Sequence, residues 1–147
     1  MRNKILVLSL VLLAGISLKA SAGNDWKVNF EEAKKSAEER HLPIFAYFSG
    51  SDWSDDCMRF DIIVLQKKEF QEFASVNLVL FQADLPRKKP LAEDIKKQNI
   101  ELRKKYGISI YPSVLLLNFE GKIIATKNYD KGDPALYVNE LRKLIGK

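Results

Sequence analysis

Two short runs of almost continuous apolar residues predict strands that are buried on both faces. They are Ile44 to Phe48 (IFAYF) and Leu78 to Ala83 (LVLFQA). Such runs are typical of strands that lie between two layers of helices. A further pair of runs, 114–118 and 122–126, flanks Phe119-Glu120-Gly121, and this arrangement predicts an antiparallel hairpin.

Stretches with helical periodicity lie before and after the first of these strands. Asn29 is a capping residue for a first helix, which ends before Pro43. A second helical stretch covers 57–74. Its periodicity is interrupted near residues 66–68, which predicts a kink or two separate helices.

Two more helices are predicted in the second half of the chain. One covers 91–106, with Pro90 in its first turn and Gly107 as its end cap. The last begins at Asp133-Pro134, where the aspartate caps and the proline starts the helix. The side chains of this last helix that we expect to face the core are Leu136, Leu141, Leu144 and Ile145.

The alternation of strands and helices predicts an α/β fold. We expect a central mixed sheet whose core is parallel, whose edge is the terminal antiparallel hairpin, and whose two faces carry helices. In such folds, binding and catalytic groups lie beyond the C-terminal ends of the strands. Ser49 to Cys57 (SGSDWSDDC) directly follows the first buried strand and is therefore the candidate site.

The first 22 residues have the three parts of a secretory signal peptide. Arg2 and Lys4 are followed by twelve mostly apolar residues, 5–16, and by the cleavage pattern Ala20-Ser21-Ala22. We expect a signal peptide at 1–22, a single domain at 23–147, and a periplasmic or secreted product with no stable membrane insertion after cleavage. The alternative is an uncleaved N-terminal anchor.

The positive charge of the chain is concentrated in that leader. The chain carries +5, and removal of 1–22 takes away three of the 24 basic residues and none of the 19 acidic ones, which leaves +2. We therefore expect no nucleic-acid partner. The basic cluster Arg87-Lys88-Lys89 lies between two prolines with no neighbouring aromatic residue, which favours a solvated loop.

Cys57 is the only cysteine in a chain that is expected to be exported into an oxidising compartment. It cannot form a disulfide within the chain. Three interpretations remain open: a buried inert thiol, a reactive site, or a partner in a covalent dimer linked through Cys57.

The sequence from Ser49 to Cys57 resembles the active site of exported, single-domain thioredoxin-like disulfide isomerases, the DsbH-like group. In that family the same place reads roughly S/T-G-S-D-W-C-x-x-C. The resemblance continues through EFQEFASVNLVLFQADLPRKK, KKQNIELRKKYGISIYPSV and FEGKIIATKNYDKGDPALYV, and so covers nearly the whole mature chain. It implies a thioredoxin-like fold, thiol–disulfide chemistry, and partners that are exported proteins or peptides with thiols or disulfides.

The resemblance also assigns the candidate site residues. Trp53 matches the tryptophan before the motif, and Cys57 matches the resolving cysteine. Ser54 stands where the attacking cysteine would be. Pro112, after Tyr111, matches the cis-proline that contacts substrate backbone in the family. Trp53, Tyr111 and Pro112 are therefore candidate substrate-binding residues, although Trp53 is equally consistent with an aromatic side chain that caps the edge of the core.

The serine at position 54 changes the expected chemistry. Thiol–disulfide exchange needs a thiolate, and a serine hydroxyl without a positioned base is a weak nucleophile. His41, the only histidine, is predicted to lie at the end of the first helix. Ser54 suits a helix N-cap, and Asp55 and Asp56 in the first turn disfavour a nearby thiolate.

Two functions follow as alternatives. The first is a member of the oxidoreductase family with a degenerate SxxC site, weak or no dithiol turnover, and residual monothiol chemistry through Cys57. The second is a non-catalytic module that binds extended polypeptide. Asp52, Asp55 and Asp56 lack the spacing of an EF-hand loop, and zinc would need cysteine or histidine ligands, so no metal and no cofactor are expected.

Overall fold

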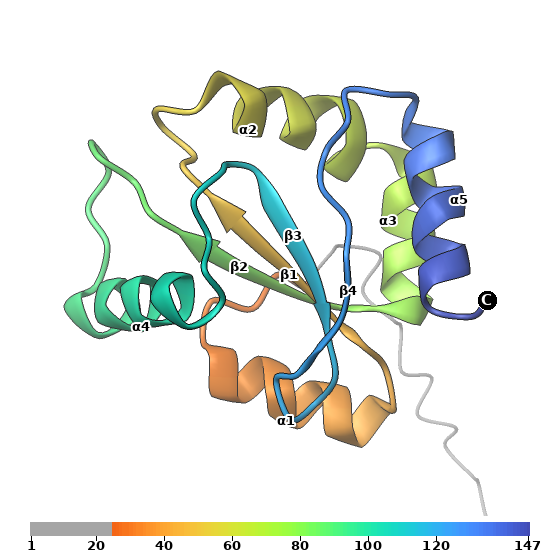
Figure 1. Ribbon diagram of the computed structural model, residues 1–147, viewed down its shortest axis with the longest axis horizontal. Coiled ribbons are helices and arrows are strands. Elements are labelled where there is room, and N and C mark those ends of the chain that lie inside the picture. The colour runs from red at the N-terminus through yellow and green to blue at the C-terminus, as the bar shows by residue number, and fades with distance from the viewer. Residues whose placement is uncertain (1–24) are drawn as a thin grey trace, which may run out of the picture.

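The computed structural model describes residues 25–147, which form a four-stranded sheet covered by helices (Figure 1). The predicted signal peptide, 1–22, lies outside the described residues. The strands lie in the order β2-β1-β3-β4. Their bounds are Ile44–Ser49 for β1, Val79–Asp84 for β2, Ser113–Leu117 for β3 and Ile123–Thr126 for β4.

Helices cover both faces of the sheet, as predicted (Figure 1). Alternate residues of β1 point to opposite sides. Phe45 and Tyr47 pack in one core cluster, whereas Ala46 and Phe48 pack in the other. The helices of the first face are α2 (Asp55–Phe60), the π-helical turn η1 (Asp61–Leu65), α3 (Lys68–Asn77) and α5 (Pro134–Leu144), and those of the second are α1 (Phe30–Arg40) and α4 (Glu93–Lys105).

The sheet is mixed and ends in an antiparallel hairpin, as predicted. Of the four strands, β1 and β2 pair in parallel, while β3 is antiparallel to both β1 and β4. The direction of β3 could not be predicted from the alternation of elements, because alternation alone does not give the direction in which a strand enters the sheet. The antiparallel pairing sets Phe48 opposite Ser113, so the chain before β3 lies beside the loop that follows β1.

Several local predictions can be compared directly with the helices. The predicted interruption near 66–68 is confirmed, because η1, which continues directly from α2, ends at Leu65 and α3 begins at Lys68. Asn29 and Asp133 cap α1 and α5 as expected. Pro90 is not in the first turn of a helix, because α4 begins only at Glu93.

The predicted inner face of α5 was partly wrong. Leu136 is 51% exposed and Leu144 is also exposed, whereas Tyr137, Val138 and Leu141 are buried against the sheet and α3. Because α5 starts at Pro134, its helical phase turns position 136 toward solvent.

Hydrogen bonds tie the loop after β1 to the loop after β2. The Asp52 carboxylate accepts the backbone N–H groups of Arg87, Lys88 and Lys89 at 2.9, 2.7 and 2.8 Å. The N–H of Arg87 is the main cause that lowers the pKa of Asp52 from 3.8 to about 2, and burial opposes it only in part. The carboxylate therefore closes the two loops into one rigid edge of the site.

We expect this carboxyl group to titrate near pH 2 in the folded protein. Because the folded pKa is depressed, its stabilising contribution is present above pH 3.8 and is lost as the pH falls through about 2. Carbon-detected NMR of the aspartate carboxyl groups measures this midpoint, with Asp52→Asn identifying the signal. A midpoint at an ordinary aspartate pKa would show that the three N–H contacts are absent in solution.

Candidate functional site

Ser54 is the N-cap of α2 in the structure. Its Oγ accepts the backbone N–H of Cys57 at 3.3 Å, and the residue is only 8% exposed. The hydroxyl thus satisfies one of the helix donors that would otherwise lack a partner. Among residues 25–147, no titratable base is hydrogen-bonded to this oxygen, and His41 lies at the opposite end of β1, where it ends α1. This geometry gives the Ser54 hydroxyl a structural use as a helix cap.

Cys57 lies in the first turn of α2 and is 2% exposed. Its Sγ accepts the backbone N–H of Gly50 at 3.5 Å. Tyr47 lies beneath it, and burial, followed by the neighbouring Cys57 sulfur, raises the pKa of the Tyr47 hydroxyl well above its usual value. A cavity of about 150 Å³ adjoins the sulfur and is lined by Tyr47, Ser51, Cys57, Met58, Asp61 and Gln82.

The antiparallel pairing of β3 brings together the three predicted substrate-binding residues. The ring centroids of Trp53 and Tyr111 are 5.4 Å apart in an edge-to-face arrangement, and the Tyr111–Pro112 bond is cis. The indole Nε1 of Trp53 donates to the carbonyl oxygen of Leu85 at 2.8 Å. Trp53 is therefore held from both sides, with part of its surface open to solvent.

Gly50 allows the tryptophan to lie this close to the main chain. A Cβ atom at position 50 would overlap the six-membered part of the Trp53 ring. The residue is therefore glycine because of a close approach, since its backbone angles are not in the left-handed region.

Three residues of the site were missed from the sequence. Ile110 is 68% exposed immediately before Tyr111 and extends the apolar surface there. The Arg87 guanidinium lies 4.0 Å from the centroid of the Trp53 ring. Lys131 pairs with Asp56 at 3.1 Å and brings the loop after β4 to the start of α2. Only Ile110 carried a signal in the sequence, as an apolar residue next to the predicted proline loop.

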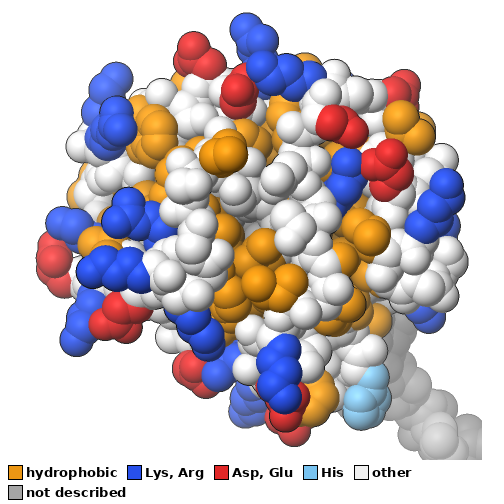
Figure 2. Space-filling view, viewed as in Figure 1, with side chains coloured by type: hydrophobic (Ala, Val, Ile, Leu, Met, Phe, Trp, Pro, Cys, Tyr) orange, Lys and Arg blue, Asp and Glu red, His pale blue; other side chains and the backbone are white. Residues whose placement is uncertain are grey.

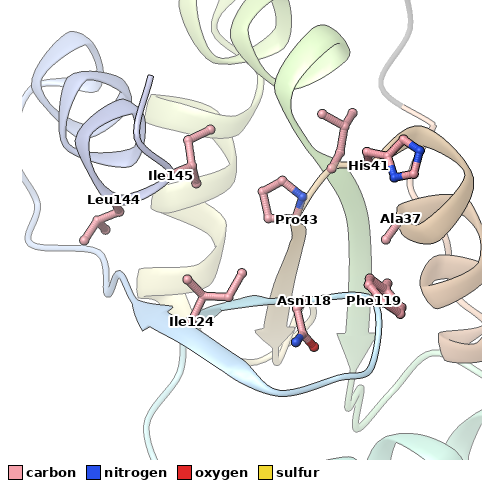
Figure 3. Close-up of a pocket in the computed structure, with 9 residues that line it drawn as sticks. Ala37, His41, Pro43, Asn118, Phe119, Ile124, Leu144 and Ile145 are labelled. Atoms are coloured by element: carbon pink, nitrogen blue, oxygen red, sulfur yellow. The ribbon is translucent and has the colours of Figure 1, made fainter.

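An apolar pocket of about 390 Å³ lies at the other end of the sheet, near the start of β1 (Figure 3). Pro43, Phe119, Ile124 and Leu144 line it, and His41 is the one titratable side chain among its lining residues. It is separate from the Trp53 site. Within 25–147, no group of three or more His, Cys, Asp or Glu residues is arranged to hold a metal ion. No helix in that range is long and apolar enough to cross a membrane.

Comparison with known proteins gives consistent matches. A family model described as thioredoxin-like matches residues 25–118. The disulfide bond reductase DsbH of Chlamydia pneumoniae is 31% identical over 126 residues, which cover 86% of this chain and 75% of that protein. The thioredoxin-related protein DsbJ of the same organism is 31% identical over 126 residues, which cover 82% of this chain and 36% of that protein.

Solved structures give the same fold. A structure of a DsbH oxidoreductase matches with a TM-score of 0.80 at 28% identity, covering 99% of this chain and 95% of that one. A disulphide isomerase from Xylella fastidiosa Temecula1 matches with a TM-score of 0.55 at 20% identity, covering 76% and 87%, and shows the fold alone. The chain belongs to the thioredoxin-like family and is related to the disulfide bond reductase DsbH and the thioredoxin-related protein DsbJ.

Proposed function

We propose that this protein is an exported member of the family that binds extended segments of thiol- or disulfide-bearing polypeptides and has weak or no dithiol turnover. The family relation supplies the class of partner. The leader-like pattern at 1–22 supports export to the periplasm or beyond the cell. The observation that carries the proposal is the combination of a Ser54 hydroxyl that caps α2 with a Cys57 thiol that is 2% exposed.

Dithiol exchange needs two sulfurs, because the attacking thiolate forms a mixed disulfide that a second thiol must resolve. This chain offers one thiol. The atoms available for binding a polypeptide belong to residues other than Cys57. They are the Trp53 and Tyr111 rings, the exposed Ile110 side chain, and the main chain around Pro112 at the start of β3. A polypeptide can therefore bind at this surface without reacting.

Monothiol chemistry through Cys57 is the second candidate function. The cavity of about 150 Å³ beside the sulfur favours it. In this reaction the Cys57 thiolate attacks a disulfide, forms a mixed disulfide with one half, and releases the other half as a thiolate. The same exposed thiol would be required for a covalent dimer, since each of these products needs access to Sγ.

We expect the Cys57 thiol to resist alkylation in the folded protein. A thiol with 2% exposure reacts with iodoacetamide mainly through transient opening, so labelling should be at least about a hundredfold slower than in the urea-unfolded chain. Mass spectrometry of samples quenched over time, across pH, gives both rates. Fast labelling of the folded chain would instead support the monothiol site and the Cys57-linked dimer.

Restoring a cysteine at position 54 should restore redox turnover. We expect Ser54→Cys to reduce a disulfide-bonded test protein in the presence of a dithiol reductant, because the helix start then carries both thiols of the CxxC arrangement. The parent chain and Ser54→Ala should stay at the background rate. Turnover by the parent chain equal to that of Ser54→Cys would contradict the proposed loss of dithiol chemistry.

Binding should depend on the aromatic surface and not on the cysteine. We expect Tyr111→Ala to weaken binding of a short, capped, uncharged peptide of Val, Thr and Tyr by on the order of tenfold, about 1.4 kcal/mol. Cys57→Ser should bind like the parent chain. Isothermal titration calorimetry measures each affinity.

Phe119→Ala is the matched control for this experiment. Phe119 is an exposed aromatic side chain in the apolar pocket at the opposite end of β1, so its loss should leave the affinity unchanged. If Phe119→Ala weakened binding and Tyr111→Ala did not, the polypeptide would bind in that pocket and the proposed site would be wrong.

A further inference from the structure

Arg87 lies against the candidate site through a contact that its sequence neighbours do not reveal. Its guanidinium is 4.0 Å from the centroid of the Trp53 ring, although the sequence favoured a solvated loop with no aromatic residue nearby. The loop is exposed as expected, but the sequence did not reveal the aromatic neighbour of Arg87, because this neighbour comes from the loop after β1. A guanidinium that stacks through its flat face keeps its N–H edge available for a carboxylate.

The backbone of the basic loop, 87–89, is fixed by hydrogen bonds, while the Arg87 side chain lies over the Trp53 ring. Asp52 holds the loop through three backbone N–H groups, and Trp53 holds it through the carbonyl oxygen of Leu85. Within 25–147, the side chains of Arg87, Lys88 and Lys89 form no ion pair. Three cationic side chains thus extend from a backbone that is already held in place, so binding a partner needs no further ordering of the loop backbone.

A pocket of about 320 Å³ lies between this loop and α4 and has the same charge. Arg87, Lys89 and Lys96 line it over an apolar floor that includes Leu91 and Ile100. Glu93 is its one acidic lining residue, with its carboxylate 4.0 Å from Lys96. In Figure 2, Lys and Arg side chains gather on the left side of the molecule, where this loop and α4 lie, and acidic side chains are interspersed among them.

The acidic residues of the neighbouring loop reduce this charge without cancelling it. The Asp52 carboxylate offsets one of the three positive charges of the basic loop, and the Lys89 ammonium is one of the groups that lower its pKa. Asp56 is paired with Lys131 at 3.1 Å. Asp55 is exposed in the first turn of α2, after Ser54, and belongs to the helix start and not to the basic loop.

We propose that this surface selects extended polypeptide segments in which acidic residues adjoin an apolar stretch. The apolar stretch contacts Trp53, Tyr111 and Ile110, and the acidic residues reach Arg87, Lys88 and Lys89 and the pocket beside α4. This inference rests on the proposed function, because it names the class of polypeptide that the same site takes.

Three capped peptides with one uncharged centre of Val, Thr and Tyr test the inference by calorimetry. Their flanks are Asp-Glu, Asn-Gln or Lys-Lys. We expect the acidic peptide to bind on the order of tenfold more tightly than the neutral one at low salt, and the basic peptide to bind most weakly. The preference should fall to less than about threefold at 1 M salt, where the screening length is about 3 Å.

Substitution of the loop lysines tests whether their charge, and not the position of the loop, causes the preference for the acidic peptide. The double variant Lys88→Gln/Lys89→Gln keeps the backbone N–H groups that Asp52 accepts, so the loop should remain in place. It should lose most of the preference for the acidic peptide and bind the neutral peptide like the parent chain. The matched control Lys143→Gln/Lys147→Gln removes the same charge at the other side of the molecule and should keep the preference.

The outcomes distinguish this inference from the proposed function. Equal affinity for acidic and neutral peptides, or an equal loss in both double variants, overturns the inference and leaves polypeptide binding standing. Failure of all three peptides to bind overturns both. Tighter binding of a single-stranded oligonucleotide than of the acidic peptide also overturns the inference, because the partner would then be nucleic acid.

Discussion

Hydrogen bonds to the Asp84 carboxylate hold the end of β1 in the position on which the whole site depends. The carboxylate accepts Ser49 Oγ at 2.8 Å, and Ser51 N–H and Oγ at 2.9 and 2.5 Å. The carbonyl oxygen of the same residue accepts the side-chain amide of the buried Asn99 at 2.8 Å. Hydrogen bonds to a charged group are the stronger kind, and loss of the acceptor would leave partly buried donors without a partner. Trp53 and Ser54 start from this anchored turn, so their positions follow from it.

Helix capping and contact with a partner are often combined at one position of a helix start. In this anchored turn they fall on different residues. The Ser54 hydroxyl accepts the N–H of Cys57, and the Cys57 sulfur is buried next to Tyr47. The at least partly exposed groups beside this turn include the aromatic Trp53 and Tyr111 rings and the aliphatic Ile110 side chain. Because capping uses other atoms than these, a serine at position 54 leaves the aromatic and aliphatic groups undisturbed.

The sequence was sufficient for features that depend on neighbouring residues. The apolar runs of β1 and β2 marked buried strands, the Asp133-Pro134 pair marked the start of α5, and the interruption near Lys67 marked the end of η1. It was insufficient where distant segments meet. The direction of β3, the exposure of Leu136 and the stacking of Arg87 on Trp53 are set by how the sheet and loops pack, and no local periodicity reports them. The place of Ser49 to Cys57 after β1 could therefore be read from the sequence, whereas the contact of Arg87 with Trp53 could not.

The stacking of Arg87 on Trp53 also links affinity to selectivity at this surface. Apolar and aromatic contacts supply binding energy that barely depends on salt, whereas fixed charges mainly choose between partners and speed their approach. Here the two kinds of group touch, since one guanidinium lies on the ring that a partner would contact. The backbone clamp by Asp52 leaves the Lys88 and Lys89 side chains free of any role in holding the loop. Their charge can therefore act on a partner without affecting how Trp53 is held.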